Sequence, residues 1–168
     1  MQLERTLRSF GWSLDEDGID IMYRSPVDIY IDQWFAELTE RIDASGVRRV
    51  LIDSIDDLRF TTADEIRFRE YMYSLVQRCA RRQISLLMTL EIPDITRVEK
   101  VSDFAVSHLS DNVVLLQYIW KGGRVTRSLT MLKARSSDVE TRLREFRITS
   151  DGVVLGDDVE PGQDFGKS

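Results

Sequence analysis

Short continuous apolar runs in the middle of the chain constrain its fold more than any other feature. Residues 50–52, 86–88 and 113–116 each form such a run, which is typical of strands covered on both faces in a parallel sheet. Before the first run, residues 31–44 repeat apolar side chains at helical spacing, and this segment stops near Gly46. The alternation predicts an α/β fold with right-handed crossover connections.

A second helix is expected between the first two runs. Thr62 is followed three residues later by Glu65, which is a capping-box signature, and apolar side chains then continue on one side of the predicted helix. Arginines fill its last turns, which suits the negative end of the helix dipole. Residues 19–22 are a weaker candidate for a strand that precedes residues 31–44.

The pattern changes beyond Gln117. Residues 121–124, with the sequence KGGR, predict a turn, and residues 125–132 then alternate as an antiparallel strand would. Residues 143–148 continue this extension, and a further turn leads into the short apolar run 153–155. The predicted fold class is therefore α/β, with a mostly parallel sheet flanked by helices and an antiparallel carboxyl-terminal extension.

Length and composition fit one folded domain. The chain has 168 residues, of which 42% are hydrophobic and 31% are charged, and this is enough to bury a core. We expect the core to span residues 1–156 and residues 157–168 to form an acidic, flexible tail.

Charge and cysteine content narrow the partners and the compartment. A formal net charge of −6 argues against a nucleic-acid partner, because binding to phosphate backbones depends on clustered Lys and Arg. The single cysteine, Cys79, permits no internal disulfide and fits a reducing compartment, where we expect it to pack as a small hydrophobe. Neither a signal peptide nor a membrane-spanning run is evident, so we expect no membrane partner and a cytoplasmic location.

The first apolar run ends in Asp53, which is followed by Ser54. At the carboxyl end of a central strand, where open α/β sheets bind ligands, this carboxylate would hold Mg²⁺ through water. An aspartate that only caps a local loop fits the short pattern equally well, so both interpretations stay open here. Asp56 and Asp57 are expected to start a polar loop rather than to form a catalytic pair.

Lys133 and Arg135 lie two residues apart on a predicted strand. Their side chains should leave the same face, in line with Leu129 and Met131, and such a pair could clamp an anion. From spacing alone, solvated charges at a strand end are the simpler interpretation. The single histidine, His108, has no carboxylate or nucleophile that the sequence places beside it, so we expect a structural or surface role.

The phosphate-binding half of a nucleotide site is not found in the sequence. No GxxxxGK[ST] motif occurs, so the chain cannot form the usual cradle of backbone N–H groups and a lysine around phosphates. One cysteine and one histidine also exclude a metal cluster of these residue types and leave only a carboxylate site.

Six short motifs follow one another in a specific order and spacing: SFGW (9–12), YRSP (23–26), RRVLIDS (48–54), SDNVVLL (110–116), LKARSSD (132–138) and LREFRIT (143–149). Together they resemble the carboxyl-terminal half of a KaiC-type ATPase domain of the RecA superfamily. The resemblance covers nearly the whole chain up to residue 156, and it is stronger to the dispersed bacterial KaiC-like ATPases than to the clock protein.

This resemblance implies roles for individual residues. Asp53 matches the Walker B aspartate that helps to place Mg²⁺, and Ser54 matches the hydroxyl residue that follows it. Lys133 and Arg135 match the basic pair that family members extend into a neighbouring subunit's site, where the pair contacts the γ-phosphate of ATP. Family members form hexameric rings with ATP at the subunit boundaries, so the resemblance also implies self-association or a homo-hexamer with head-to-tail contacts.

The sequence also departs from the family pattern. The P-loop and the family's paired catalytic glutamates are expected upstream of Met1. Ser136 stands where the family usually has Gly, Val139 stands where His is common, and His108 replaces the Thr of the clock protein's phosphorylation pair. Clock autokinase activity is therefore not expected.

Two classes of function stay open. In the first, which we favour, the chain is part of an ATPase that binds and hydrolyses ATP with Mg²⁺ at subunit interfaces in signalling or regulation, and it is inactive until a P-loop is supplied. In the second, it is a nucleotide-free interaction or scaffold module for KaiC-like or signalling proteins. The presence of Asp53 together with the basic pair favours the first class.

Overall fold

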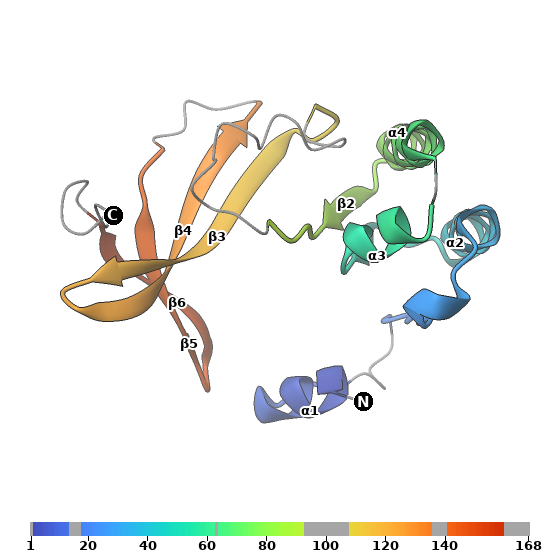
Figure 1. Cartoon of the computed structure of the whole chain (residues 1–168). Coiled ribbons are helices and arrows are strands. Elements are labelled where there is room, and N and C mark those ends of the chain that lie inside the picture. The colour runs from blue at the N-terminus through green and yellow to red at the C-terminus, as the bar shows by residue number, and fades with distance from the viewer. Residues whose placement is uncertain (1, 14–17, 63, 93–107, 136–140, 160–168) are drawn as a thin grey trace. The chain divides into compact units, whose positions relative to one another are not determined.

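The computed structural model describes residues 2–13, 18–62, 64–92, 108–135 and 141–159 (Figure 1). The chain forms two compact units, one from Ile21–Leu109 and the other from Met1–Asp20 together with Ser110–Ser168. Within the described ranges, no helix has the length and apolar character needed to cross a membrane.

The unit Ile21–Leu109 is built from helices and a pair of parallel strands (Figure 1). Its elements are a 3₁₀ turn (Pro26–Asp28), α2 (Ile31–Ser45), β1 (Arg49–Ile52), α3 (Ile55–Phe60), α4 (Glu65–Arg81) and β2 (Ser85–Met88). β1 and β2 pair in parallel, with α3 and α4 between them in the chain, so the two strands predicted from apolar runs are confirmed. α2 is confirmed as well, and it ends because Gly46 adopts a left-handed φ of 65°.

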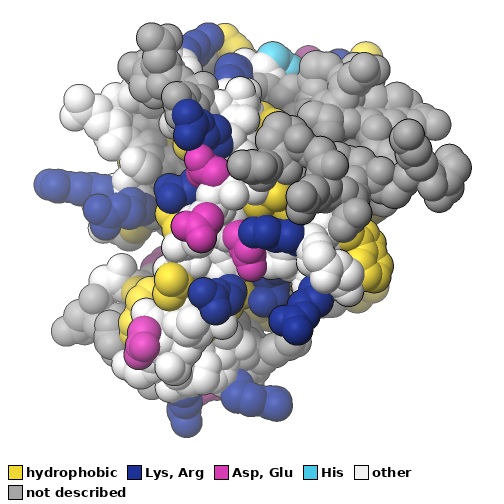
Figure 2. All heavy atoms as spheres, turned by 90° about the vertical axis from the view of Figure 1, so that its left-hand side faces the viewer, with side chains coloured by type: hydrophobic (Ala, Val, Ile, Leu, Met, Phe, Trp, Pro, Cys, Tyr) yellow, Lys and Arg dark blue, Asp and Glu magenta, His cyan; other side chains and the backbone are white. Residues whose placement is uncertain are grey.

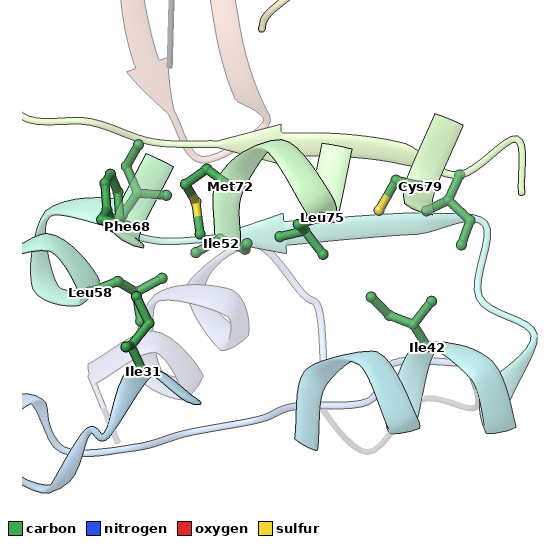
Figure 3. Close-up of a cluster of buried hydrophobic side chains, with 10 residues drawn as sticks. Ile31, Ile42, Ile52, Leu58, Phe68, Met72, Leu75 and Cys79 are labelled. Atoms are coloured by element: carbon green, nitrogen blue, oxygen red, sulfur yellow. The ribbon is translucent and has the colours of Figure 1, made fainter. Parts of the chain in front are cut away.

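The core of this unit lies between α4, α2 and β1 (Figure 3). Phe68, Met72 and Leu75 of α4 are at most 1% exposed, and Ile52 reaches them from β1. Full burial of side chains of this size stabilises a fold by about 1.5–3 kcal/mol each. Cys79 belongs to the same cluster, as predicted, and burial raises the pKa of its thiol, which makes it a packing residue rather than a nucleophile.

Two leucines on the other side of the parallel pair are exposed. Leu51 and Leu87 are cross-strand partners, and each is 63% exposed. Side chains alternate between the two faces of a strand, so Leu51 must point away from the core that its neighbour Ile52 enters. Within the described residues of this unit, the core therefore covers one face of the parallel pair and leaves these two leucines exposed.

The amino-terminal end of α4 differs from the prediction. Asp64, and not Thr62, is the cap: its side chain accepts hydrogen bonds from the backbone N–H groups of Ile66 and Arg67. The Thr62 hydroxyl instead donates to the Leu58 carbonyl at 2.9 Å and so belongs to the end of α3. The helix α3 itself replaces the polar loop expected around residues 56 and 57.

The second unit contains an antiparallel sheet with the strand order β3-β4-β5-β6 (Figure 1). Its elements are α1 (Gln2–Ser9), β3 (Asn112–Lys121), β4 (Arg124–Ala134), β5 (Arg144–Thr149) and β6 (Gly152–Asp158). The predicted KGGR turn joins β3 and β4, and its two glycines have positive φ values of 57° and 74°, as a tight hairpin turn requires. The mixed α/β fold class with an antiparallel extension is confirmed.

Two strand predictions were wrong in detail. Residues 113–116 lie in β3, which pairs antiparallel with β4, although their continuous apolar run suggested a parallel strand. An apolar run does not fix the direction of the neighbouring strand, and here the hairpin turn decides the pairing; Val114 and Leu116 of the run are also exposed. Residues 19–22 form no strand; Ile19 and Ile21 are 52% and 39% exposed.

Candidate functional site

Asp53 lies directly beyond the carboxyl end of β1, and its side chain is exposed to solvent. Ser54, half-buried, is the residue that precedes α3, and the peptide bond between Asp53 and Ser54 is cis. This is the edge of a parallel sheet at which α/β proteins bind their ligands. The predicted placement of the carboxylate at a strand end is therefore what the structure contains.

Thr89 holds the Asp53 carboxylate from the end of the neighbouring strand. The Thr89 hydroxyl donates a hydrogen bond to Oδ1 of Asp53. The backbone repeats the link, since Thr89 N–H donates to the Ile52 carbonyl at 3.0 Å and Ile55 N–H donates to the Thr89 carbonyl at 3.1 Å. Among the described residues no other side chain is hydrogen-bonded to Asp53, so the carboxylate is oriented and still open to solvent.

Asp56 has a structural task at the same edge. It sits in the first turn of α3, and its Oδ2 accepts a hydrogen bond from the Glu91 backbone N–H at 2.7 Å. This contact ties the segment after β2 to α3. Asp56 therefore belongs neither to a polar loop nor to a catalytic pair, because its carboxylate joins α3 to the segment after β2.

The carboxylates at this edge do not form a complete protein cage for a metal. In the described part of the chain, no group of three or more His, Cys, Asp or Glu side chains is placed to hold an ion. Mg²⁺ in nucleotide sites is held by one or two carboxylates, with waters and phosphate oxygens as its remaining ligands. One exposed, oriented carboxylate such as Asp53 fits that requirement.

The basic pair is fastened to the beginning of β3. Lys133 is half-buried, and its Nζ donates to the Ser110 carbonyl at 2.7 Å. Arg135 follows the end of β4; its guanidinium pairs with Asp111 Oδ1 at 2.9 Å, and its backbone N–H donates to the Asp111 carbonyl at 3.0 Å. The segment 110–111 therefore positions both cations.

The prediction that the side chains of Lys133 and Arg135 lie on the same face of the strand as Met131 is only partly correct. Lys133 is opposite Val113, whereas Met131 is opposite Val114, and a bulge separates the two pairings. Adjacent residues of β3 point to opposite faces, so Lys133 does not share the face of Met131. One inserted residue in β4 causes this change, and the alternation of residue types does not reveal it.

The Arg135–Asp111 pair is open to exchange. The two side chains are 68% and 65% exposed. Ion pairs in such positions are screened by water and salt and contribute little to folding. An incoming anion can therefore compete with Asp111 for the guanidinium without a large cost to the fold.

Asp53 and Ser54 belong to the unit Ile21–Leu109, whereas Lys133 and Arg135 belong to the other unit. The site is thus described as a carboxylate group and a cationic group, each within its own unit. On the face drawn in Figure 2, basic and acidic described side chains are interspersed. Within the antiparallel sheet, Lys121 and Glu145 form an ion pair at 3.0 Å, and the hydrogen bond from Lys121 is the main cause that lowers the pKa of Glu145.

Comparison with known proteins identifies the family. A family model described as "ATPase: KaiC" matches residues 1–160. The chain belongs to the KaiC ATPase family. The circadian clock protein KaiC3 of Synechocystis sp. is 27% identical over 153 residues, which cover 87% of this chain and 30% of that protein. The circadian clock oscillator protein KaiC of Synechococcus elongatus is 23% identical and aligns with 93% of this chain and 31% of its own length.

A solved structure supports the same fold. The KaiC-like protein from the hyperthermophilic archaeon Pyrococcus horikoshii superposes with a TM-score of 0.73 and is 22% identical; the match covers 93% of this chain and 70% of that one. This KaiC-family chain spans about a third of the length of the curated relatives it matches.

Two residues that contact the candidate site were not predicted from the sequence. Thr89 directly follows the strand 86–88, so a hydroxyl at the same sheet edge as Asp53 was a usable signal. Asp111 precedes β3, and its partnership with Arg135 follows only from the register of the β3–β4 hairpin. Ser136 and Val139, noted as departures from the family, lie outside the described residues.

Proposed function

We propose that this chain supplies the Walker B edge and the trans-acting basic pair of a KaiC-type ATPase, which binds and hydrolyses ATP between subunits of a ring. The observation that carries the proposal is the exposed Asp53 carboxylate, oriented by Thr89 at the carboxyl edge of β1 and β2. A carboxylate that merely capped a loop would have its oxygens turned toward local backbone N–H groups.

Asp53 would hold Mg²⁺ through water, with Ser54 beside it. When bound, Mg²⁺ neutralises charge on the phosphate oxygens of ATP. Thr89 keeps the carboxylate in one orientation, so the cost of ordering it is met before nucleotide arrives. The exposed position of Asp53 leaves room for the waters that Mg²⁺ retains.

Lys133 and Arg135 would act on the neighbouring subunit's ATP. Arg135 exchanges its exposed partner Asp111 for the γ-phosphate, and Lys133, fastened to the Ser110 carbonyl, supports the end of the strand and adds positive charge. This role requires a homo-oligomeric ring with head-to-tail interfaces. We place the assembly in the cytoplasm, in signalling or regulation.

The decisive experiment joins this chain to a phosphate-binding segment. In a hybrid polypeptide, the P-loop segment of a KaiC-like ATPase precedes this chain, and Mg²⁺-dependent release of phosphate from ATP is measured. We expect Asp53→Asn to slow hydrolysis by about 10- to 100-fold. Asp57→Asn, which changes the same charge in the first turn of α3, is the matched control and should retain activity.

The chain by itself is expected to bind ATP weakly or not at all, because it contains no phosphate cradle. Isothermal titration that detects tight Mg·ATP binding to the purified chain would contradict this. Hybrid rings that assemble but do not hydrolyse ATP would instead support a nucleotide-free interaction module.

A further inference from the structure

The outer side of α4 carries a hollow that has no part in the proposed nucleotide site. Its volume is about 450 Å³, and it is lined by Tyr73, Ser74, Gln77, Arg78, Arg81 and Arg82. These lining residues come from α4 and the residue that caps its carboxyl end. The hollow therefore lies along one helix, within the unit Ile21–Leu109.

The spacing of the sequence creates the hollow. Residues four apart lie above one another on a helix, so positions 73, 77 and 81 form one row and positions 74, 78 and 82 form the next. Tyr73 and Arg81 are large side chains at the two ends of the first row, whereas Ser74 begins the second row with a small one. The result is a groove between two rows of side chains, opposite the buried face of the helix.

The groove has an excess of positive charge. Asp43 of α2 is the acidic partner of both Arg78 and Arg82. Hydrogen bonding from Arg78 is the main cause that lowers the pKa of Asp43. In the described part of the chain Arg81 has no ion-pair partner, so the three arginines of the groove are balanced by one carboxylate, which contacts two of them.

Favourable interaction with the helix dipole explains basic residues at the end of α4 but not the whole arrangement. The dipole does not require Tyr73, which is 55% exposed in the same groove. Tyr and Arg are the residue types enriched where proteins bind proteins, because Tyr presents an apolar ring with a polar end and Arg binds carboxylates through two parallel hydrogen bonds. Asp43, accepting from two nitrogen atoms of Arg78, already shows this carboxylate geometry.

We propose that the α4 groove, formed by these six residues, is a docking site for an acidic segment of a partner protein. Arg81 binds a carboxylate of that segment, Arg82 adds positive charge beside it, and Tyr73 packs against one of the segment's apolar side chains. Charge complementarity favours this occupant over nucleic acid, since a chain with a net charge of −6 and one short basic groove cannot follow a phosphate backbone over several nucleotides.

The test uses a synthetic fluorescein-labelled peptide of glutamates with leucines at intervals, and its binding to the full chain is followed by fluorescence anisotropy. We expect binding at low ionic strength that weakens as salt rises toward about 0.15 M. Arg81→Glu should weaken binding by roughly tenfold or more. Tyr73→Ala should weaken it while leaving the salt dependence unchanged.

Arg124→Glu is the matched control, because it makes the same change of charge on β4 in the other unit. It should leave the affinity within about twofold of the original chain, as expected of a charge outside the interface. Far-UV circular dichroism checks that each variant keeps its helices. The proposal is overturned if the peptide does not bind the original chain at low salt, if Arg81→Glu and Arg124→Glu bind it equally well, or if a single-stranded oligonucleotide occupies the groove more tightly than the peptide.

Discussion

Thr89 donates its hydroxyl hydrogen to Oδ1 of Asp53, so that the residues following two neighbouring parallel strands are joined side chain to side chain. This contact converts a carboxylate at a strand end into an oriented one. It also makes Thr89 a positioning residue for the proposed Mg²⁺ site, because it acts through Asp53.

We expect Thr89→Val in the hybrid polypeptide to lower Mg²⁺-dependent hydrolysis by about tenfold. Val has the shape of Thr without the hydroxyl, so the loss of one hydrogen bond should cost about 1 kcal/mol in the free energy of unfolding. Thr89→Ser restores the hydroxyl and should recover most of the activity. Mg²⁺ titrations of the hydrolysis rate measure the effect, and identical titration curves for Val and Ser would show that the contact has no role in metal placement.

Removing the Arg135 side chain should lower the rate of ATP hydrolysis much more than it lowers the affinity for ATP. In the hybrid ring we expect Arg135→Ala to slow hydrolysis by roughly 100-fold, because the side chain acts on charge that develops in the transition state. The affinity for ATP should change much less. Arg124→Ala on the same strand is the control, and single-turnover rates with equilibrium nucleotide titrations give both quantities. A loss of affinity as large as the loss of rate would argue against the trans role.

The cap of α4 gives a prediction about stability. Asp64→Ala removes the acceptor for two backbone N–H groups and should lower the free energy of unfolding by about 1 kcal/mol. Glu65→Gln, one position along, removes a charge without touching the cap and serves as its control. Urea unfolding curves compare the two, and an equal loss in both variants would mean that charge, and not the cap, holds the helix end.

Asp32 should contribute to the acid sensitivity of the fold. Hydrogen bonds from Tyr71 and then Arg67 lower the pKa of Asp32 below its ordinary value of 3.8. A depressed carboxyl pKa gives stability that is present above the unfolded-state pKa and is lost as the pH falls through the folded-state pKa. The thermal melting temperature should therefore fall as the pH is lowered below about 4. In Asp32→Asn this fall in melting temperature should be smaller.

Asp28→Asn is the control for this pH dependence, since Asp28 lies in the 3₁₀ turn just before α2. Its melting temperature should fall at low pH as much as that of the original chain. Parallel curves for Asp32→Asn and the original chain would contradict the prediction.

The sequence was informative wherever one residue type or one periodicity decides the local structure. Left-handed Gly46 ends α2, the two glycines of the KGGR turn permit the hairpin, and apolar runs locate β1 and β2. Asp53 was placed at the strand end correctly for the same reason, because a charged residue directly after an apolar run is expected where the strand stops.

Some features could not be predicted because two nearby residues are equally suited to the same role. Others depend on how the strands are aligned with one another. Thr62 and Asp64 can both cap a helix, and the chain uses the second for α4 because the Thr62 hydroxyl is taken up by the end of α3. The bulge that turns Lys133 away from the face of Met131 is a single extra residue. The contacts of Thr89 and Asp111 join residues far apart in the chain, which only the folded backbone brings together.

The exposed leucines of the β1–β2 pair, Leu51 and Leu87, bear on how the protein is best handled in solution. Salting-out anions such as sulfate strengthen apolar burial, so we expect them to favour association of copies through Leu51 and Leu87. Dilute samples in chloride buffers are the appropriate starting material. In a series of rising ammonium sulfate concentrations, association through these leucines is expected to begin first, and it would then be mistaken for ring formation.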